Sequence, residues 1–333
     1  MSYVAKPAGY FISCACILAL CDPAVASGAA EVEHAQQASI VVNADSVIRD
    51  HLPPTLFGFN VQHYNFQNDL WDEEKRAAAD SILSAMTFFP GAIYRYPGGL
   101  VANRFQWKET IGPVPERGLQ KVVKSGPARR VLFGVEEFLQ FVESVGGQPW
   151  YVLNLAGWDT ESMFRELPEQ TMTESNAELA KLMKASLGTV PRYYQLGNEL
   201  DRAEYQWPHD KYVQRARSTM AAIQAIDPDA RFVAFLRDFD WKYKGGAGNG
   251  SVSGYEQFIA DVLQGLPSVN NFSLHFYYDD PGMAEKYKQI PWRLNQFQRA
   301  IDAASRHREG RRPNVWITEH ARGGNLAAGK LME

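Results

Sequence analysis

Short apolar runs that alternate with segments of helical periodicity constrain the fold of this chain most strongly. This rhythm is typical of β/α units, in which parallel strands form a central sheet and helices cover it. Helices are expected at residues 72–88, 134–145, 210–226 and 255–263, and a long loop from 97 to about 130. Seven strands are expected at residues 56–64, 92–96, 150–155, 192–196, 231–236, 272–277 and 314–318.

These units predict an α/β fold of the (β/α)8 TIM-barrel type, and a length of 333 residues fits one large domain of this kind. Eight strands close such a barrel, and the seventh is followed only by a helical pattern at 325–333. The sequence therefore predicts a catalytic barrel at 53–333 that is truncated after strand seven. Alternatively, residues 39–42 complete the sheet, but a parallel neighbour needs a long crossover connection. We expect them to form an accessory strand in an N-terminal segment, 27–52.

The first 26 residues have the pattern of a signal peptide. Lys6 precedes an apolar run at 11–21, and the small residues Ala24 and Ala26 mark a cleavage site. The run is shorter than the roughly 20 residues that span a bilayer as a helix. The mature protein is therefore expected to be secreted or periplasmic, without a permanent membrane span. Cys21 ends a lipobox-like run in which Leu20 replaces the usual small residue, so lipoprotein anchoring is the minor alternative.

The charge and the scattered histidines narrow the class of ligand. A formal net charge of −4 gives no basic stripe to bind nucleic acid, so a neutral substrate is favoured. All three cysteines lie inside the predicted signal peptide, and the seven histidines show no zinc-binding spacing. We therefore expect neither a metal nor another cofactor. The oligomeric state stays open.

Two glutamates follow predicted strands at the edge where barrel enzymes carry their reactive groups. Glu199 ends the run Tyr-Tyr-Gln-Leu-Gly-Asn-Glu after strand four, and Glu319 ends Val-Trp-Ile-Thr-Glu after strand seven. Two carboxylates facing each other suit cleavage of a glycosidic bond, in which one protonates the leaving oxygen and the other attacks the anomeric carbon. Either glutamate alone is equally well explained as a helix cap or a surface acid. Their joint position favours a catalytic pair.

Other polar residues at the predicted strand ends are candidates for binding the substrate. Asn198 can donate its amide to a sugar hydroxyl, although a turn at the strand end also explains it. His275 and Tyr277 alternate along strand six and share one face, where the tyrosine can orient Glu319. Core packing of both is the competing interpretation. Arg95 can bind the nucleophilic carboxylate or a sugar hydroxyl through its fork of donors, or form a buried structural ion pair.

Two further residues follow strand three, and we expect them to line the sugar subsite. They are Asn154 at the end of the strand and Trp158 just beyond it, where the tryptophan alternatively caps the barrel.

The chain resembles clan A of the glycoside hydrolases, and most closely family 51, the α-L-arabinofuranosidases. Asn198-Glu199 resembles the Asn-Glu pair that carries the acid/base in that family, and Glu319 matches its nucleophile. The stretch from Arg95-Tyr96-Pro97-Gly98-Gly99 through Trp107 to Glu116-Arg117 is similar to the long second loop of the family. The resemblance covers roughly residues 39–333, and Gln62 stands at or near a position where the family carries a sugar-binding glutamate.

This resemblance implies a retaining hydrolase that degrades polysaccharide or oligosaccharide by double displacement, with Glu199 as acid/base and Glu319 as nucleophile. Two carboxylates and water complete this chemistry without a cofactor. An endo-acting β-glycanase of the same clan is the alternative enzyme. A catalytically silent carbohydrate-binding protein, or a truncated fragment, is the alternative from outside enzymology.

Overall fold

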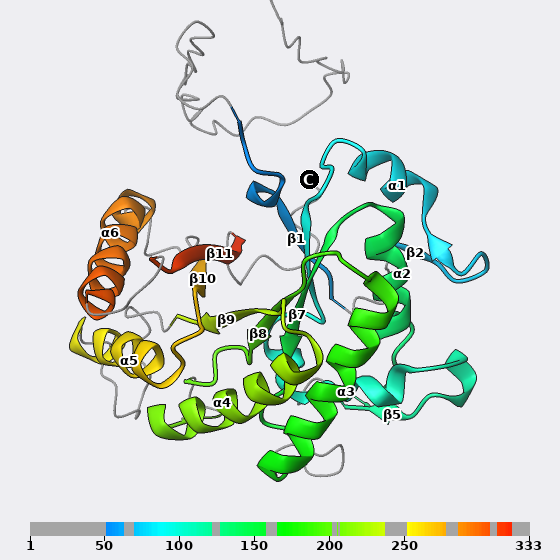
Figure 1. The fold of residues 1–333 in the computed structure, drawn as a ribbon. Helices are drawn as coiled ribbons and strands as arrows, with labels where there is room; N and C mark the ends of the chain where they lie inside the picture. Colours follow the sequence, from blue (N-terminus) through cyan, green and yellow to red (C-terminus); the bar gives the residue numbers. More distant parts are fainter. Residues whose placement is uncertain are drawn as a thin grey trace, which may run out of the picture. The chain divides into compact units, whose positions relative to one another are not determined.

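The computed structural model describes residues 51–62, 70–121, 127–157, 165–201, 205, 207–236, 252–277, 286–306 and 312–321. These residues belong to one compact unit, His51–Glu333. Its centre is a parallel sheet of seven strands with helices on its outer side (Figure 1). The prediction of an α/β barrel is confirmed. The predicted signal peptide, the accessory strand at 39–42 and the helix at 325–333 lie outside the described residues.

The strands follow one another around the sheet in chain order, and every neighbouring pair is parallel. Chain-order neighbours of this kind are joined by crossovers that carry the outer helices. The strands are β1 (Gly58–Asn60), β4 (Ile93–Tyr96), β7 (Gln148–Leu153), β8 (Tyr193–Leu196), β9 (Arg231–Phe235), β10 (Asn271–Tyr277) and β11 (Asn314–Ala321). The helices are α1 (Asp80–Met86), α2 (Val135–Ser144), α3 (Glu169–Leu187), α4 (His209–Ile226), α5 (Val252–Gly265) and α6 (Lys286–Ser305).

Alternate side chains of the strands form two separate apolar clusters. The larger cluster packs between the sheet and the helices and includes Tyr94, Tyr194 and Phe272. The smaller one fills the barrel interior, where Trp150 stacks on Tyr193 with ring centroids 5.3 Å apart. Trp316 from β11 meets Trp150 edge-on at 5.6 Å. Because rings from β7, β8 and β11 are in contact, the sheet curves around a packed interior, as in a TIM barrel.

The first and last strands of the sheet approach each other. The amide Nδ2 of Asn60, the last residue of β1, donates to the carbonyl oxygen of Thr318 in β11 at 2.7 Å. Ser273 of β10 binds the hydroxyl of Thr318 at 2.5 Å on the other side. A side chain therefore links β1 to β11, although no backbone ladder is formed between these two strands within the described residues. This link brings residues of both ends of the chain to one site.

Two sequence predictions were wrong in detail. The expected helix at 72–88 begins only at Asp80, because residues 71–78 form a hairpin of β2 (Trp71–Asp72) and β3 (Ala77–Ala78). Asp72 takes the backbone N–H of Lys75 at 3.0 Å, which is a turn rather than a helical contact. The loop from 97 to 130 contains short 3-10 helices at Leu100–Arg104, Trp107–Thr110 and Val114–Glu116, and a hairpin of β5 (Leu119–Gln120) and β6 (Arg129–Arg130).

The helix expected at 134–145 is confirmed as α2, and its N-terminus is held by a side chain. The carboxylate of Glu137 accepts the backbone N–H of Gly134 at 2.8 Å and pairs with the Arg117 guanidinium at 2.6 Å. This buried pair attaches the long second loop to the barrel. In the part of the chain that the structure describes, no helix is long and apolar enough to cross a membrane.

Candidate active site

A tight turn after β8 presents the first candidate catalytic group. Gly197 has φ of 75°, and Glu199 itself has φ of 47°, in the left-handed region that side chains other than glycine seldom occupy. Between them, the backbone N–H of Asn198 donates to Asn103 Oδ1 at 3.0 Å. The Asn103 amide donates in return to the Asn198 carbonyl at 2.6 Å. The long second loop therefore fixes this turn through the buried side chain of Asn103.

A change of register places the second carboxylate. Leu274 of β10 pairs with Ile317 of β11, but the next residue, His275, pairs with Glu319, so Thr318 is skipped. The irregularity turns His275 and Glu319 to the same side of the sheet. Beside them, a Cβ built on Gly99 would lie 3.1 Å from Glu319 Oε1, so a side chain at this point of the loop after β4 would require the carboxylate to move by a few tenths of an ångström.

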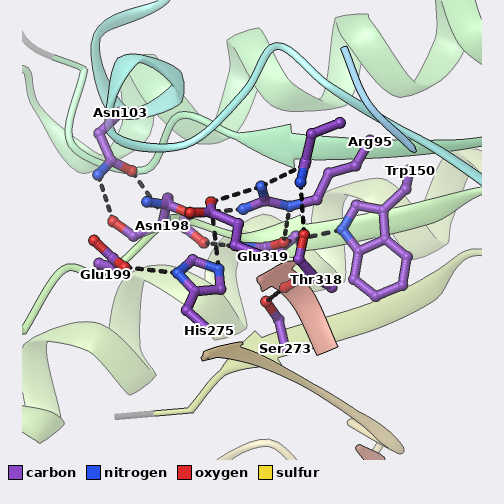
Figure 2. Close-up of polar contacts among 12 residues, drawn as sticks. Arg95, Asn103, Trp150, Asn198, Glu199, Ser273, His275, Thr318 and Glu319 are labelled. Atoms are coloured by element: carbon purple, nitrogen blue, oxygen red, sulfur yellow. Dashed lines mark hydrogen bonds and ion pairs between the residues drawn. The ribbon is translucent and has the colours of Figure 1, made fainter. Parts of the chain in front are cut away.

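His275 lies between the two glutamates, as Figure 2 shows. Its Nδ1 is 2.6 Å from Glu199 Oε1, and its Nε2 is 3.4 Å from Glu319 Oε1. The second contact is within ion-pair distance, but Nε2 is buried and makes no hydrogen bond. One ligand atom from each of the three residues lies within 4.8 Å of the others. The two carboxylates therefore face each other around one imidazole ring.

Arg95 holds this array from the barrel interior. Its Nη1 donates to Glu319 Oε1 at 2.8 Å and to Asn60 Oδ1 at 2.9 Å. Its Nη2 donates to Asn198 Oδ1 at 2.6 Å, and its Nε to Gln195 Oε1 at 2.9 Å. All four acceptors come from different turns or strands, so the guanidinium fixes the distance between the β8 turn and β11 (Figure 2). Both interpretations of Arg95 from the sequence, a carboxylate clamp and a buried ion pair, describe this one contact.

The side-chain amide of Asn198 makes one structural hydrogen bond through its oxygen and leaves its nitrogen without a partner. Its oxygen accepts from Arg95, while its Nδ2 is buried without a hydrogen-bond partner. Leaving such a donor unpaired costs about 1–3 kcal/mol, which a ligand oxygen at that point would recover. Asn198 therefore offers one donor without a partner next to the Arg95 guanidinium.

The remaining candidates from the sequence divide into three groups. Asn154 is committed to loop structure, since its Oδ1 accepts the N–H of Gly157 at 2.6 Å and its Nδ2 donates to Phe105 O at 3.3 Å. Gln62 is half-buried and lies against Gly98, where an added Cβ would meet its Cγ at 3.0 Å. Trp158 lies outside the described residues. Tyr277 is the last residue of β10, and its side chain is likewise outside the described part.

Sequence reasoning missed three amides that build the site: Asn60, Asn103 and Gln195. Gln195 is fully buried, accepts Trp150 Nε1 at 3.0 Å as well as Arg95, and donates to Gly197 O at 3.0 Å. A glutamine inside an otherwise apolar parallel strand is unusual and was the available signal for it. Asn60 and Asn103 carry no comparable local signal, because Asn60 is the last residue of a short strand and Asn103 lies in a 3-10 helix of the second loop, where polar residues are common.

A family model described as "Alpha-L-arabinofuranosidase 1 domain" matches residues 85–295. The chain belongs to this family. The match contains Arg95, Asn198, Glu199 and His275, whereas Glu319 lies beyond its last residue. The match therefore says nothing of Glu319, whose position comes from the structure.

Curated relatives and solved structures agree with this family. The chain is 26% identical over 242 residues to an intracellular exo-alpha-(1->5)-L-arabinofuranosidase of Streptomyces lividans, covering 68% of this chain and 35% of the relative. An intracellular exo-alpha-L-arabinofuranosidase of Bacteroides ovatus is 24% identical, covering 73% of this chain and 47% of the relative. This chain thus spans between a third and a half of the length of these two relatives.

The fold is shared with solved arabinofuranosidases. A family 51 alpha-L-arabinofuranosidase from Bifidobacterium longum superposes with a TM-score of 0.64 at 15% identity, over 84% of this chain and 58% of that one. The Thermotoga maritima enzyme, solved with arabinose, gives a TM-score of 0.57 at 17% identity, over 79% and 56%. Identities this low support the shared fold and carry no information about substrate.

Proposed function

We propose that this protein is a retaining glycoside hydrolase that acts on α-L-arabinofuranosides by double displacement. One observation carries the reaction class, namely that ligand atoms of Glu199 and Glu319 lie within 4.8 Å of each other. Retaining enzymes hold their carboxyl groups about 5–5.5 Å apart, and inverting enzymes about 6.5–9.5 Å, to leave room for a water molecule. The sugar is proposed from the names of the relatives, all of which are arabinofuranosidases.

In the first step, Glu199 donates a proton to the glycosidic oxygen while a Glu319 oxygen attacks the anomeric carbon. The bond from that carbon to the leaving oxygen breaks, its electron pair stays on the oxygen, and a glycosyl ester forms on Glu319. In the second step, the ionised Glu199 takes a proton from water, whose oxygen attacks the same carbon. The ester bond then breaks and its electron pair returns to Glu319.

The neighbouring side chains support this assignment of roles. Arg95 donates to Glu319 Oε1 at 2.8 Å, which orients the carboxylate for attack. The unpaired Nδ2 of Asn198 points to a hydrogen bond with a substrate hydroxyl, and such bonds strengthen as the transition state forms. Gln62 is proposed to line the sugar site. Asn154 is proposed to support that site by holding the turn at Gly157. For Tyr277 the proposed role is to orient Glu319, and for Trp158 it is to line the sugar subsite.

The test is hydrolysis of a panel of aryl glycosides by the full chain, led by the α-L-arabinofuranoside, together with Glu199→Gln and Glu319→Gln. We expect turnover by the wild type, with both variants reduced by at least about 1000-fold. Product anomers read by NMR at early times should retain the configuration of the substrate. Inversion, or full activity of Glu319→Gln, would reject the proposal. Release of reducing ends from polymers without activity on aryl glycosides would instead identify an endo-acting glycanase.

We also propose that residues 1–26 direct export, because Lys6 precedes the apolar run and Ala24-Val25-Ala26 follows it. The S. lividans and B. ovatus relatives are named as intracellular, which favours the opposite location. N-terminal sequencing of the protein recovered from periplasmic and cytoplasmic fractions distinguishes the two. A mature N-terminus at residue 27 in the periplasm supports export, and an intact Met1 in the cytoplasm rejects it.

A further inference from the structure

His275 presents an unused donor atom to a pair of carboxylates. Its Nε2 is buried without a hydrogen-bond partner, although the ring is 8% exposed and both neighbours are charged. The proposed hydrolysis uses the glutamates and assigns no role to this nitrogen. Buried imidazole nitrogens are ordinarily satisfied, so an unsatisfied one beside carboxylates suggests a ligand that has not been considered.

The spacing of these atoms matches the ligands of a tetrahedral metal ion. Zinc binds imidazole nitrogen and carboxylate oxygen at about 2.0–2.2 Å, so two of its ligands lie about 3.4 Å apart. His275 Nε2 and Glu319 Oε1 are separated by 3.4 Å, which is too long for a strong hydrogen bond. Glu199 contacts the opposite nitrogen of the ring, so it supports the imidazole instead of completing the ligand set, and water fills the remaining positions around the ion.

The surroundings of these residues resemble those of known metal ligands in two respects. A histidine that binds a metal through one nitrogen ordinarily donates the other to a carboxylate, and His275 Nδ1 lies 2.6 Å from Glu199 Oε1. Ligating carboxylates are themselves hydrogen-bonded, and Glu319 Oε1 already accepts from Arg95 at 2.8 Å. Both carboxylates therefore stand beside the imidazole with oxygen atoms of the kind that bind cations.

We infer that Glu199, His275 and Glu319 form a binding site for one divalent cation of the zinc class, and that the cation excludes the sugar. Mixed nitrogen and oxygen ligands suit zinc, whereas calcium takes six to eight oxygens and magnesium an octahedron of them. The bound cation occupies the Glu319 carboxylate, which hydrolysis requires as the nucleophile, and leaves Glu199 in contact with His275 Nδ1. Zinc therefore inhibits the enzyme by competing with substrate, and a chelator reverses the inhibition. This binding goes beyond the proposed function and is measured without it.

The first test is calorimetric titration of the full chain with Zn²⁺. Because cysteine thiolates are general zinc ligands, the background is the full chain carrying Cys14→Ser, Cys16→Ser and Cys21→Ser. We expect one equivalent bound by this protein, an affinity at least about 100-fold lower in His275→Ala, and a loss of about 10–100-fold in Glu199→Ala. Glu319→Gln, which conserves shape, serves as the second variant in case His275→Ala does not fold.

The matched control is His209→Ala. His209 Nδ1 also lies 2.6 Å from a carboxylate, that of Asp261, but no second carboxylate faces its ring within the described residues. Its loss should leave zinc binding unchanged. Zinc binding that persists in both His275→Ala and Glu319→Gln, or that is lost with His209, overturns the inference.

Inhibition is then measured on the α-L-arabinofuranoside. Zn²⁺ should raise KM without changing kcat, EDTA should restore the rate, and Mg²⁺ and Ca²⁺ should have no effect. Inhibition that lowers kcat alone would overturn the competition with the sugar. If the protein binds zinc but hydrolyses no glycoside, the cation site stands and the proposed function fails. If it hydrolyses glycosides and binds no zinc, the proposed function stands and the cation site is rejected.

Discussion

Gln195 Oε1 accepts a hydrogen bond from Arg95 Nε at 2.9 Å in the barrel interior, beneath the carboxylates. The same oxygen accepts Trp150 Nε1 at 3.0 Å, and the glutamine amide donates to Gly197 O, at the start of the turn that ends in Glu199. One uncharged side chain thus holds both the arginine that contacts Glu319 and the turn that carries Glu199. Gln195 touches neither carboxylate, so it is a positioning residue.

Gln195→Met should lower kcat by about 10–100-fold with little change in KM, because a displacement of the order of 1 Å in a catalytic group has effects of this size. Methionine fits the volume but leaves Arg95 Nε and Trp150 Nε1 unpaired, so unfolding free energy should also fall by about 1–3 kcal/mol for each. The control is Gln120→Met, since Gln120 is equally buried and bonds only the backbone of Gln106. It should lose stability and keep its kcat. Equal kcat losses in the two variants would show that Gln195 acts through stability alone.

The link between β1 and β11 leads to a second prediction. Asn60 donates to Thr318 O and accepts from Arg95 Nη1, so it connects the two edge strands to the arginine. Asn60→Asp keeps the acceptor and loses the donor, while its new charge competes with Glu319 for Arg95. We expect a lower kcat and faster amide hydrogen exchange in β11, by a factor of about 5 for one lost hydrogen bond of about 1 kcal/mol.

Asn60→Ser is the companion variant, because a hydroxyl is too short to join both partners but adds no charge. It should speed exchange in β11 to a similar extent with a smaller loss of kcat. Unchanged exchange in both variants would mean that the contact with Thr318 does not hold the strand.

Much of the barrel and of its mouth could be predicted from local patterns. Strand order follows from the alternation of strands and helices, and Glu199 and Glu319 follow from the rule that barrel strands end at the reactive edge. The hairpin at 71–78 could not be predicted, because its apolar residues also fit a helical period. The helices α3 and α6 were not assigned, because both are rich in charged and amide side chains and α6 also contains Pro291, which ordinarily breaks a helix.

The internal order of the site depends on contacts that no local pattern contains. His275 meets both glutamates only because the register shifts by one residue between Leu274 and His275, and a shift of this kind leaves no trace in composition. For the same reason, a search for zinc-binding spacing could not find three ligands separated by 76 and 44 positions. Arg95 could be proposed as a clamp, and Gln195 is conspicuous as an amide in an apolar strand, but the contacts of Arg95 with Gln195 and with Asn60 could not be predicted.

A pH dependence of stability should arise below the active site. Arg192, just before β8, pairs with Asp227 after α4 through Nε–Oδ2 at 2.7 Å and Nη2–Oδ1 at 2.9 Å, and both are buried. Hydrogen bonding to Arg192 holds the pKa of Asp227 below its ordinary value of 3.8. A lowered folded-state pKa stabilises the protein above pH 3.8, and this stability is lost as the pH falls through the folded-state pKa.

Asp227→Asn should therefore lower the unfolding free energy by about 3–5 kcal/mol at pH 7. The difference in unfolding free energy between this variant and the wild type should become smaller as the pH falls below about 4. Urea unfolding from pH 7 to pH 2.5 measures both. Asp229→Asn removes a nearby exposed carboxylate from the same turn and should change stability by less than about 0.5 kcal/mol. A gap that stays constant with pH would show that the Asp227 carboxylate does not carry the linkage.

The backbone of Glu199 carries strain that a glycine would release. Its φ of 47° costs an L side chain about 1–2 kcal/mol, and the position is nevertheless held by a residue with a Cβ. Glu199→Gly and Glu199→Ala both remove the carboxylate and the contact with His275, so they differ only in Cβ. Glycine escapes the steric cost but adds about 0.4–1 kcal/mol of chain entropy to the unfolded state. The glycine variant should therefore be more stable than the alanine variant by up to about 1 kcal/mol.

At exposed Glu143 in α2 the order should reverse, because glycine in a helix is less stable than alanine by about 0.5–1 kcal/mol. Urea unfolding of the four variants measures both differences, and the same order at both positions would show that the turn stores no strain. Both Glu199 variants should be inactive, so a more stable glycine variant would mean that the turn trades stability for the placement of the acid/base.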